Sequence, residues 1–282
     1  MSTRHLPLLV FILALLSCAE DFAPDNPLDP ENPEYIPPFV TITDGPQDGS
    51  TVSSSSVDFE WDGNEPAMIF RYRKNDESWS DWVSSKSKTF NYLDEGGYTV
   101  SVQGQYTTGD TSEVVSSSFT VDAVSGSAIR FYRLYTEASL GDQITLDIYA
   151  EEVVNLAGAE IVVEFDAESV YYQSVSPGDF FYLNGGEMLL FDTLTVDAGT
   201  GTLRLDAAVL GGEPEYVSGT GVMASLVFQA SGTGETEISF NAGATTLRKA
   251  NNDVIEIEEL VGGLVMRLGG WKRAEVGDEG LK

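Results

Sequence analysis

Residues 157–166 read Ala-Gly-Ala-Glu-Ile-Val-Val-Glu-Phe-Asp. Every second side chain from position 159 is small or apolar and is expected to face a core: Ala159, Ile161, Val163 and Phe165. The alternate side chains are expected to face outward: Glu160, Val162 and Glu164. A period of two is typical of a β-strand with one buried and one solvated face. The stretch therefore predicts a sheet, not a helix.

The same alternation continues through the second half of the chain. In Thr202–Val209 the apolar side chains of Leu203, Leu205 and Ala207 are expected to face inward, which leaves Arg204, Asp206 and Ala208 outside. Nine strands are predicted between residues 129 and 268: Ile129–Tyr135, Gln143–Ala150, Ala157–Asp166, Val170–Val175, Glu187–Phe191, Thr202–Val209, Val222–Ala230, Glu235–Asn241 and Gly263–Leu268. So many short strands predict a nine-stranded jelly-roll sandwich.

Residues 39–122 have a pattern of their own. Val57, Phe59 and Trp61 alternate with acidic residues, and turn signals such as Glu95-Gly96-Gly97 separate the alternating runs. About seven strands in this length predict an immunoglobulin-like sandwich. The run from Phe70 through Trp79 and Trp82 to Tyr98 resembles fibronectin type III modules. Trp79 and Trp82 are either exposed side chains that stack on a sugar or part of the core.

The N-terminus predicts a lipid anchor. Arg4 and His5 precede an apolar run, Leu6–Leu16, that is too short to span a bilayer and ends at Cys18, the only cysteine. Residues 15–18 resemble a lipobox, so we expect a signal peptide over 1–17 and diacylglycerol on Cys18. An ordinary secretory signal is the alternative. The expected location is the bacterial cell envelope, at the outer membrane or the cell surface.

Three further segments connect or end the modules. Residues 18–38 are acidic with prolines at 24, 27, 30 and 33, a spacing that predicts an extended polyproline II tether. Residues 123–128 are a small-residue linker, and the charged tail 269–282 is expected to be disordered.

Composition excludes several functions. The formal charge of −30 argues against nucleic acid as a partner. The only histidine is His5, inside the predicted signal peptide, which leaves no histidine or free thiol for catalysis. Carboxylate pairs such as Glu151-Glu152 leave glycoside hydrolysis open, but an acidic surface supplies such pairs by chance. Asp142, Asp166 and Asp179 are expected to cap turns rather than bind calcium, and no metal or cofactor site is predicted.

The second module resembles a cohesin. Gly141-Asp142 before an alternating strand, Phe165-Asp166 after another, the turn Pro177-Gly178-Asp179 and the strand Gly221–Phe228 occur in the family's order. The family's proline after the aspartate is replaced by Ala167. The resemblance implies a non-catalytic jelly roll that binds calcium-loaded dockerin modules and so gathers polysaccharide-degrading enzymes.

The family's binding face includes the strand that corresponds to 157–166. The resemblance therefore implies six partner-binding residues: Glu160, Val162, Glu164, Arg204, Asp206 and Ala208. Arg204 and Asp206 depart from the family, in which apolar contacts are commoner. The predicted function is a membrane-anchored protein that docks a dockerin-bearing partner in polysaccharide degradation. The alternatives are a carbohydrate-binding lipoprotein and a structural envelope protein.

Overall fold

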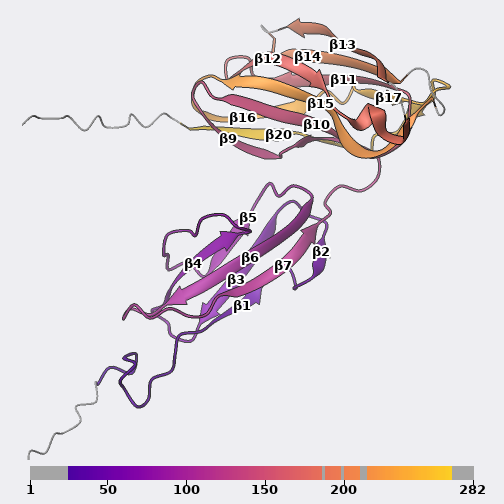
Figure 1. Ribbon diagram of the computed structural model, residues 1–282. Helices are drawn as coiled ribbons and strands as arrows, with labels where there is room; N and C mark the ends of the chain where they lie inside the picture. Colours follow the sequence, from indigo (N-terminus) through magenta and orange to yellow (C-terminus); the bar gives the residue numbers. More distant parts are fainter. Residues whose placement is uncertain (1–24, 186–187, 198–199, 210–214, 269–282) are drawn as a thin grey trace, which may run out of the picture.

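The computed structural model describes residues 25–185, 188–197, 200–209 and 215–268, which form two β-sandwiches joined by a short linker (Figure 1). The predicted signal peptide, Cys18 and the tail 269–282 lie outside the described residues. Within the described ranges, none of the helical segments has the length and apolar character needed to cross a bilayer.

The first sandwich has the predicted seven strands within the described residues. They are β1 (Val40–Asp44), β2 (Ser50–Val52), β3 (Val57–Gly63), β4 (Ile69–Lys74), β5 (Ser87–Phe90), β6 (Gly96–Gln105) and β7 (Val115–Val121). One sheet has the order β1-β3-β5 and the other β2-β7-β6-β4. Phe59, Trp61 and Phe70 are buried between the sheets. The relation of this module to immunoglobulin or fibronectin families stays a prediction.

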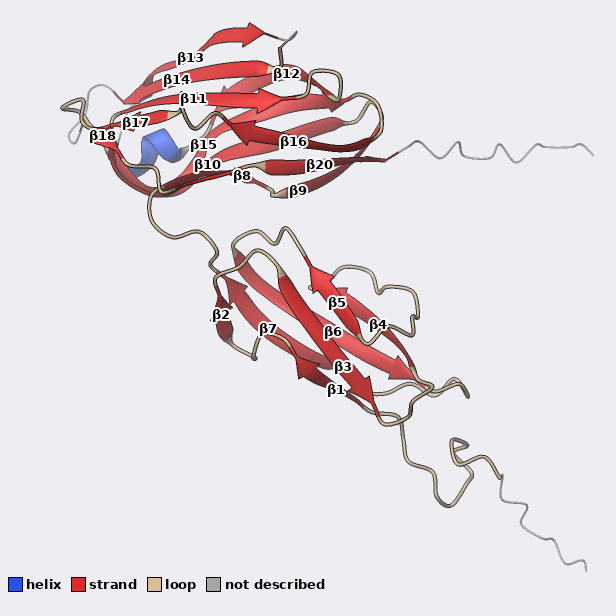
Figure 2. Cartoon of the chain, turned by 180° about the vertical axis from the view of Figure 1, so that it is seen from behind, coloured by secondary structure: helices blue, strands red, loops and turns tan. Residues whose placement is uncertain are grey.

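The second sandwich contains a five-stranded and an eight-stranded sheet in the described part of the chain (Figure 2). The first consists of β12 (Val170–Pro177), β15 (Val217–Ala230), β10 (Gln143–Leu156), β8 (Ala128–Tyr132) and β19 (Glu259–Val261), in that order. The second has the order β13 (Met188–Asp197), β14 (Thr202–Val209), β11 (Gly158–Phe165), β16 (Gly234–Phe240), β20 (Gly263–Leu268) and β9 (Tyr135–Ser139). In addition, β17 (Thr246–Arg248) pairs with β11, and β18 (Val254–Ile255) pairs with β17. A 3-10 helix, η1 (Phe180–Gly185), packs near β15.

The all-β prediction is confirmed, but the count of nine strands was too low. The chain leaves β8 after Tyr132 and begins β9, in the other sheet, at Tyr135, whereas one continuous strand was predicted there. The short strands β17, β18 and β19 have two or three residues each, too few to show a period. Residues 251–253 lie in a turn, across which Arg248 pairs with Val254.

Apolar side chains from both sheets form the core of the second sandwich. Phe131 of β8 stacks on Phe240 of β16 with ring centres 4.4 Å apart. Phe165 of β11 meets Phe228 of β15 edge-on at 5.1 Å. Each ring projects from the inward face of its strand, so the alternation along β11 is what directs Phe165 into this core.

Residues 26–35 form consecutive turns, so the polyproline II prediction is wrong for this segment. The amides of Asp29, Asn32 and Tyr35 each donate to the carbonyl three residues earlier, whereas polyproline II has no internal hydrogen bonds. Asn or Asp precedes each proline, and the side chains of Asn26, Asp29 and Asn32 accept the amide two residues further on. These Asx turns favour a turn over the extended form.

The end of this segment is fixed to the first sandwich. The Tyr106 hydroxyl donates to the Ile36 carbonyl over 3.0 Å, and the Asn64 amide donates to the Pro37 carbonyl over 3.3 Å. Leu28 and Tyr35 pack against the first core. The acidic segment is therefore attached to the module along its length and does not hang free of it.

Polar contacts join the two sandwiches. The Leu134 amide donates to the Asp94 carboxylate over 2.8 Å, and Tyr92 stacks on Tyr135 with ring centres 5.7 Å apart. One carboxylate oxygen of Glu95 accepts both amides at the start of the linker, at positions 123 and 124. The linker is thus hydrogen-bonded at its origin, and a loop of the first module, residues 91–95, contacts the second.

Asp94 gives this junction a pH dependence. Burial raises the pKa of Asp94 above its ordinary 3.8, although the Leu134 amide and nearby cations pull that pKa down. The folded chain then binds this proton more tightly than the unfolded chain, so the Asp94 contribution to stability falls as pH rises from about 4 through the raised pKa. Asp94→Asn keeps an acceptor for Leu134 and removes the charge.

We therefore expect the melting temperature of Asp94→Asn, relative to that of the wild type, to rise between pH 4 and pH 7. Scanning calorimetry at several pH values measures this difference. Asp81→Asn, at an exposed position of the same module, is the matched control and is expected to show no such trend. Equal pH trends for the two variants would contradict the assignment.

Candidate binding face of the second sandwich

The outward side of β11 and its neighbours forms a continuous polar surface, here called the β11 face. The register pairs Gly158 with Ala208 and Arg248, and Glu160 with Asp206 and Thr246. Further along, Val162 pairs with Arg204, and Glu164 pairs with Thr202 and Ser239. The structure thus brings together all six residues predicted for partner binding. Five of them are at least partly exposed.

An ion-paired arginine occupies the middle of the β11 face. Arg204 Nη1 lies 3.0 Å from Glu160 Oε1, and Arg204 Nε lies 3.4 Å from Asp206 Oδ1. The Arg204 side chain remains 42% exposed, so solvent screens both pairs and they add little to stability. Their effect is geometric, because a guanidinium between two carboxylates has a restricted orientation.

The prediction that Val162 is exposed was wrong. Its side chain is only 7% exposed, because the loop between β16 and β17, residues 241–245, folds over it. The Val162 amide donates to Thr245 Oγ1 over 3.2 Å, and the Val162 carbonyl accepts the Asn241 amide over 2.8 Å. The loop takes the place of a neighbouring strand between the points where β17 and β16 pair with β11. Val162 is therefore buried on the outward side of β11 and offers little surface to a partner.

The two ends of the β11 face differ in charge. At one end Glu164 is exposed and accepts a hydrogen bond from the side-chain amide of Asn241 over 2.7 Å. At the other end Arg248, which the sequence analysis missed, lies beside Gly158 and donates to the Asn252 carbonyl over 3.1 Å. Arg248 belongs to the hairpin between Leu247 and Val254, whose first strand, β17, pairs with β11 but is too short to show a period.

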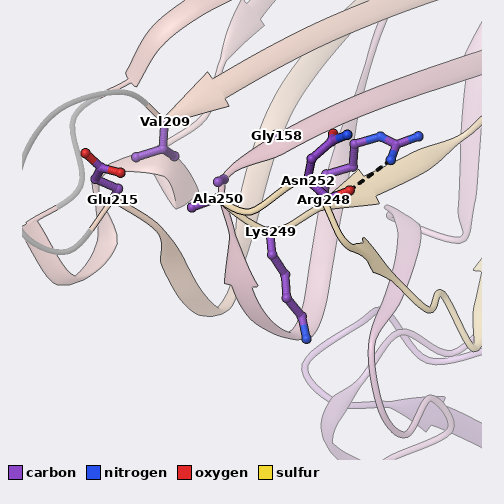
Figure 3. Close-up of a pocket in the computed structure, with 8 residues that line it drawn as sticks. Gly158, Val209, Glu215, Arg248, Lys249, Ala250 and Asn252 are labelled. Carbon is purple, nitrogen blue, oxygen red and sulfur yellow. Dashed lines mark hydrogen bonds between the residues drawn. The ribbon is translucent and has the colours of Figure 1, made fainter.

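An open depression lies at the Arg248 end (Figure 3). Small or apolar side chains form part of its lining: Ala157, Gly158, Val209 and Ala250. Lys249 points away from the Arg248 side chain in Figure 3, and Glu215 lies on the far side of the depression. The depression therefore combines a small apolar surface with two cations and, on its far side, the carboxylate of Glu215.

Trp79 and Trp82 lie in the first sandwich among arginines. The Arg71 guanidinium is 4.8 Å from the Trp79 ring centre and 4.7 Å from that of Trp82. Arg73, two residues along the same strand, lies 4.7 Å from Trp79. Cation–π contacts of this kind occupy the ring faces that a sugar would need. Both indoles are half-buried, and Trp61 is fully buried as predicted.

Two of the acidic residues considered for catalysis or metal binding, Glu151 and Asp166, have structural partners. Glu151 forms a buried ion pair with Arg130 at 3.1 Å, so it does not form a free carboxylate pair with Glu152. The Asp166 carboxylate accepts hydrogen bonds from the Ser169 hydroxyl and the Glu168 backbone amide. Both bonds lower the pKa of Asp166, and the bond from the hydroxyl has the larger effect. In the part of the chain that the structure describes, no three His, Cys, Asp or Glu residues gather around a possible metal position.

Thr245 is expected to hold the loop of the β11 face. Thr245→Val keeps the shape and removes the acceptor for the buried Val162 amide, at a cost of about 1–3 kcal/mol in unfolding free energy. The neighbouring Thr246→Val is the matched control, since its side chain is half-buried and has no such bond. Urea unfolding of both variants measures the difference. Equal losses would show that the hydrogen bond is not the cause.

One family model matches within the second module. The family model described as the cohesin domain matches residues 135–258. A search of curated proteins found no match.

Several solved structures are similar to about half of the chain. A non-cellulosomal cohesin from the archaeon Archaeoglobus fulgidus is 12% identical, with a TM-score of 0.41, and the match covers 51% of this chain and 92% of that one. A chain of a type I cohesin–dockerin complex from Clostridium thermocellum is 16% identical with a TM-score of 0.42, and the match covers 51% of this chain and 100% of that one. The sixth cohesin of scaffoldin B from Acetivibrio cellulolyticus, solved with a dockerin mutant, is 19% identical with a TM-score of 0.42. That match covers 51% of this chain and 100% of the other.

Proposed function

We propose that this chain, whose residues 135–258 match the cohesin domain model, captures a dockerin-bearing protein on its β11 face. The observation that carries the proposal is the register of β11 with β14 and β17. It gathers the candidate contact residues on one surface. Cohesin domains are non-catalytic binding modules, so capture without chemistry is the proposed activity.

The physical state of the β11 face suits rigid docking. Strands on both sides of β11 hold its backbone, the 241–245 loop is hydrogen-bonded to Val162, and Arg204 lies between two carboxylates. Side chains that are already ordered lose little conformational freedom when a partner binds. The face presents charged and small side chains, so hydrogen bonds and ion pairs orient the bound partner more than apolar burial does.

Capture of dockerin modules tests this proposal. Each dockerin module encoded by the same genome is purified in calcium buffer and passed over the immobilised chain, with titration calorimetry on any that are retained. The double variant Glu160→Ala/Asp206→Ala, which removes both partners of Arg204, is expected to weaken binding by at least tenfold. Glu113→Ala, at an exposed position of the first sandwich, is the matched control. Retention of no dockerin, or equal binding by all variants, contradicts the proposal.

We further propose that the protein is held at a bacterial membrane through lipid on Cys18 and serves polysaccharide degradation. The support for the anchor is the apolar run 6–16 before a single cysteine. Acyl chains contribute about 0.8 kcal/mol per buried CH₂, so two or more chains hold a protein firmly. The turn-rich segment 26–35 and the first sandwich then separate the β11 face from the membrane.

Replacement of Cys18 is expected to release the protein. Cys18→Ser removes the thiol that receives the lipid, so the chain should move from the membrane pellet to the soluble fraction of fractionated cells. Mass spectrometry of the wild-type N-terminal peptide reports the acyl chains directly. A soluble wild-type protein with an unmodified cysteine contradicts the anchor but leaves the dockerin proposal intact.

A further inference from the structure

The charges along the β11 face are ordered, and most of them are already paired. In the middle, Arg204 lies between Glu160 and Asp206, so these three side chains leave a single net negative charge. A partner that places another strong charge there competes with an existing ion pair. The middle of the face is therefore suited to uncharged polar or small side chains.

The ends of the face carry charges that lack an oppositely charged partner. Among the described residues no carboxylate lies within ion-pair distance of Arg248 and no Lys or Arg within that distance of Glu164. Within residues 25–268, apart from the undescribed gaps, the side chain of Arg248 bonds only a backbone carbonyl, and that of Glu164 bonds only a neutral side-chain amide. Both side chains therefore keep their charge available to a partner.

The distance between these two charges follows from the register. Arg248 lies beside Gly158, which precedes Glu164 by six residues on the same strand. At about 3.3 Å per residue, the two ends are about 20 Å apart. A helix rises about 1.5 Å per residue, so this separation corresponds to about 13 residues of a helix laid along β11.

We infer that the partner's contact surface is bipolar: a carboxylate faces Arg248, a cation faces Glu164 about 20 Å away, and uncharged side chains lie between them. This inference rests on the proposed function and names the partner within it. The depression beside Arg248, part of whose lining is Ala157, Gly158 and Ala250, admits a small apolar side chain next to the partner's carboxylate. Bipolarity also fixes the direction in which the partner lies, because the reverse direction places like charges together at both ends.

Charge reversal at the two ends tests the inference. With the dockerin that the wild type binds most tightly, Arg248→Glu and Glu164→Lys are each expected to raise Kd by about tenfold or more, since like charges then meet. The loss should shrink as salt rises toward 1 M, where the screening length is only about 3 Å. Glu164→Gln retains an acceptor for Asn241 and should give a smaller loss, which separates charge from any disturbance of the loop.

Matched controls carry the same charge changes in the first sandwich. Lys88→Glu and Glu113→Lys alter exposed side chains there and are expected to change Kd by less than twofold. Restoration of binding by the complementary charge reversal in the dockerin supports direct pairing. If the dockerin binds the wild type, Arg248→Glu and Glu164→Lys equally, the bipolar inference is wrong and the proposed function stands. If no dockerin binds, the proposed function fails and the inference fails with it.

Discussion

The hydrogen-bonded register of β11 controls both the core and the surface of the second sandwich. Pairing with β14, β16 and β17 sets which side chains of this strand face inward. Ile161, Val163 and Phe165 then contact the opposite sheet, while Glu160 and Glu164 remain outside. A slip of one residue would move every side chain to the other face, so the core fixes the binding surface.

The binding surface is completed by segments far away in the chain. The loop 241–245 covers the one apolar side chain that the strand places outward, and β17 adds Arg248 beside Gly158. Ion pairs around Arg204 then order the middle of the face. A surface built from three distant segments presents a fixed pattern of charge. Such a pattern favours selective recognition of one partner orientation over tight but unspecific adhesion.

The first sandwich is attached to the second through the junction. Its 91–95 loop bonds the Leu134 amide and stacks on Tyr135, and its other end holds the turn-rich segment. The Tyr98 hydroxyl donates to the Asp94 carbonyl, and burial raises the pKa of Tyr98 to about 12, so this donor stays protonated. These contacts give the β11 face a defined orientation relative to the N-terminal segment, which a free linker would not provide.

The sequence by itself determined the all-β class, the two modules and the inward and outward sides of the long strands. Those features follow from a local period of two, which Ile161 or Leu205 displays without reference to any distant residue. Even the six candidate contact residues were found together on one face, because β11 and β14 both alternate clearly.

Only the tertiary structure decided which of those residues a partner can reach and how they are charged. Val162 alternates as an outward residue, but a loop about 80 residues later in the chain covers it. Arg248 lies in a strand of three residues, too short to show a period, so its place beside Gly158 depends on long-range pairing. The prolines at every third position indicated an extended segment, yet side chains of Asn and Asp closed it into turns. Alternation is a local property of the chain, whereas coverage and charge pairing depend on which distant segments meet.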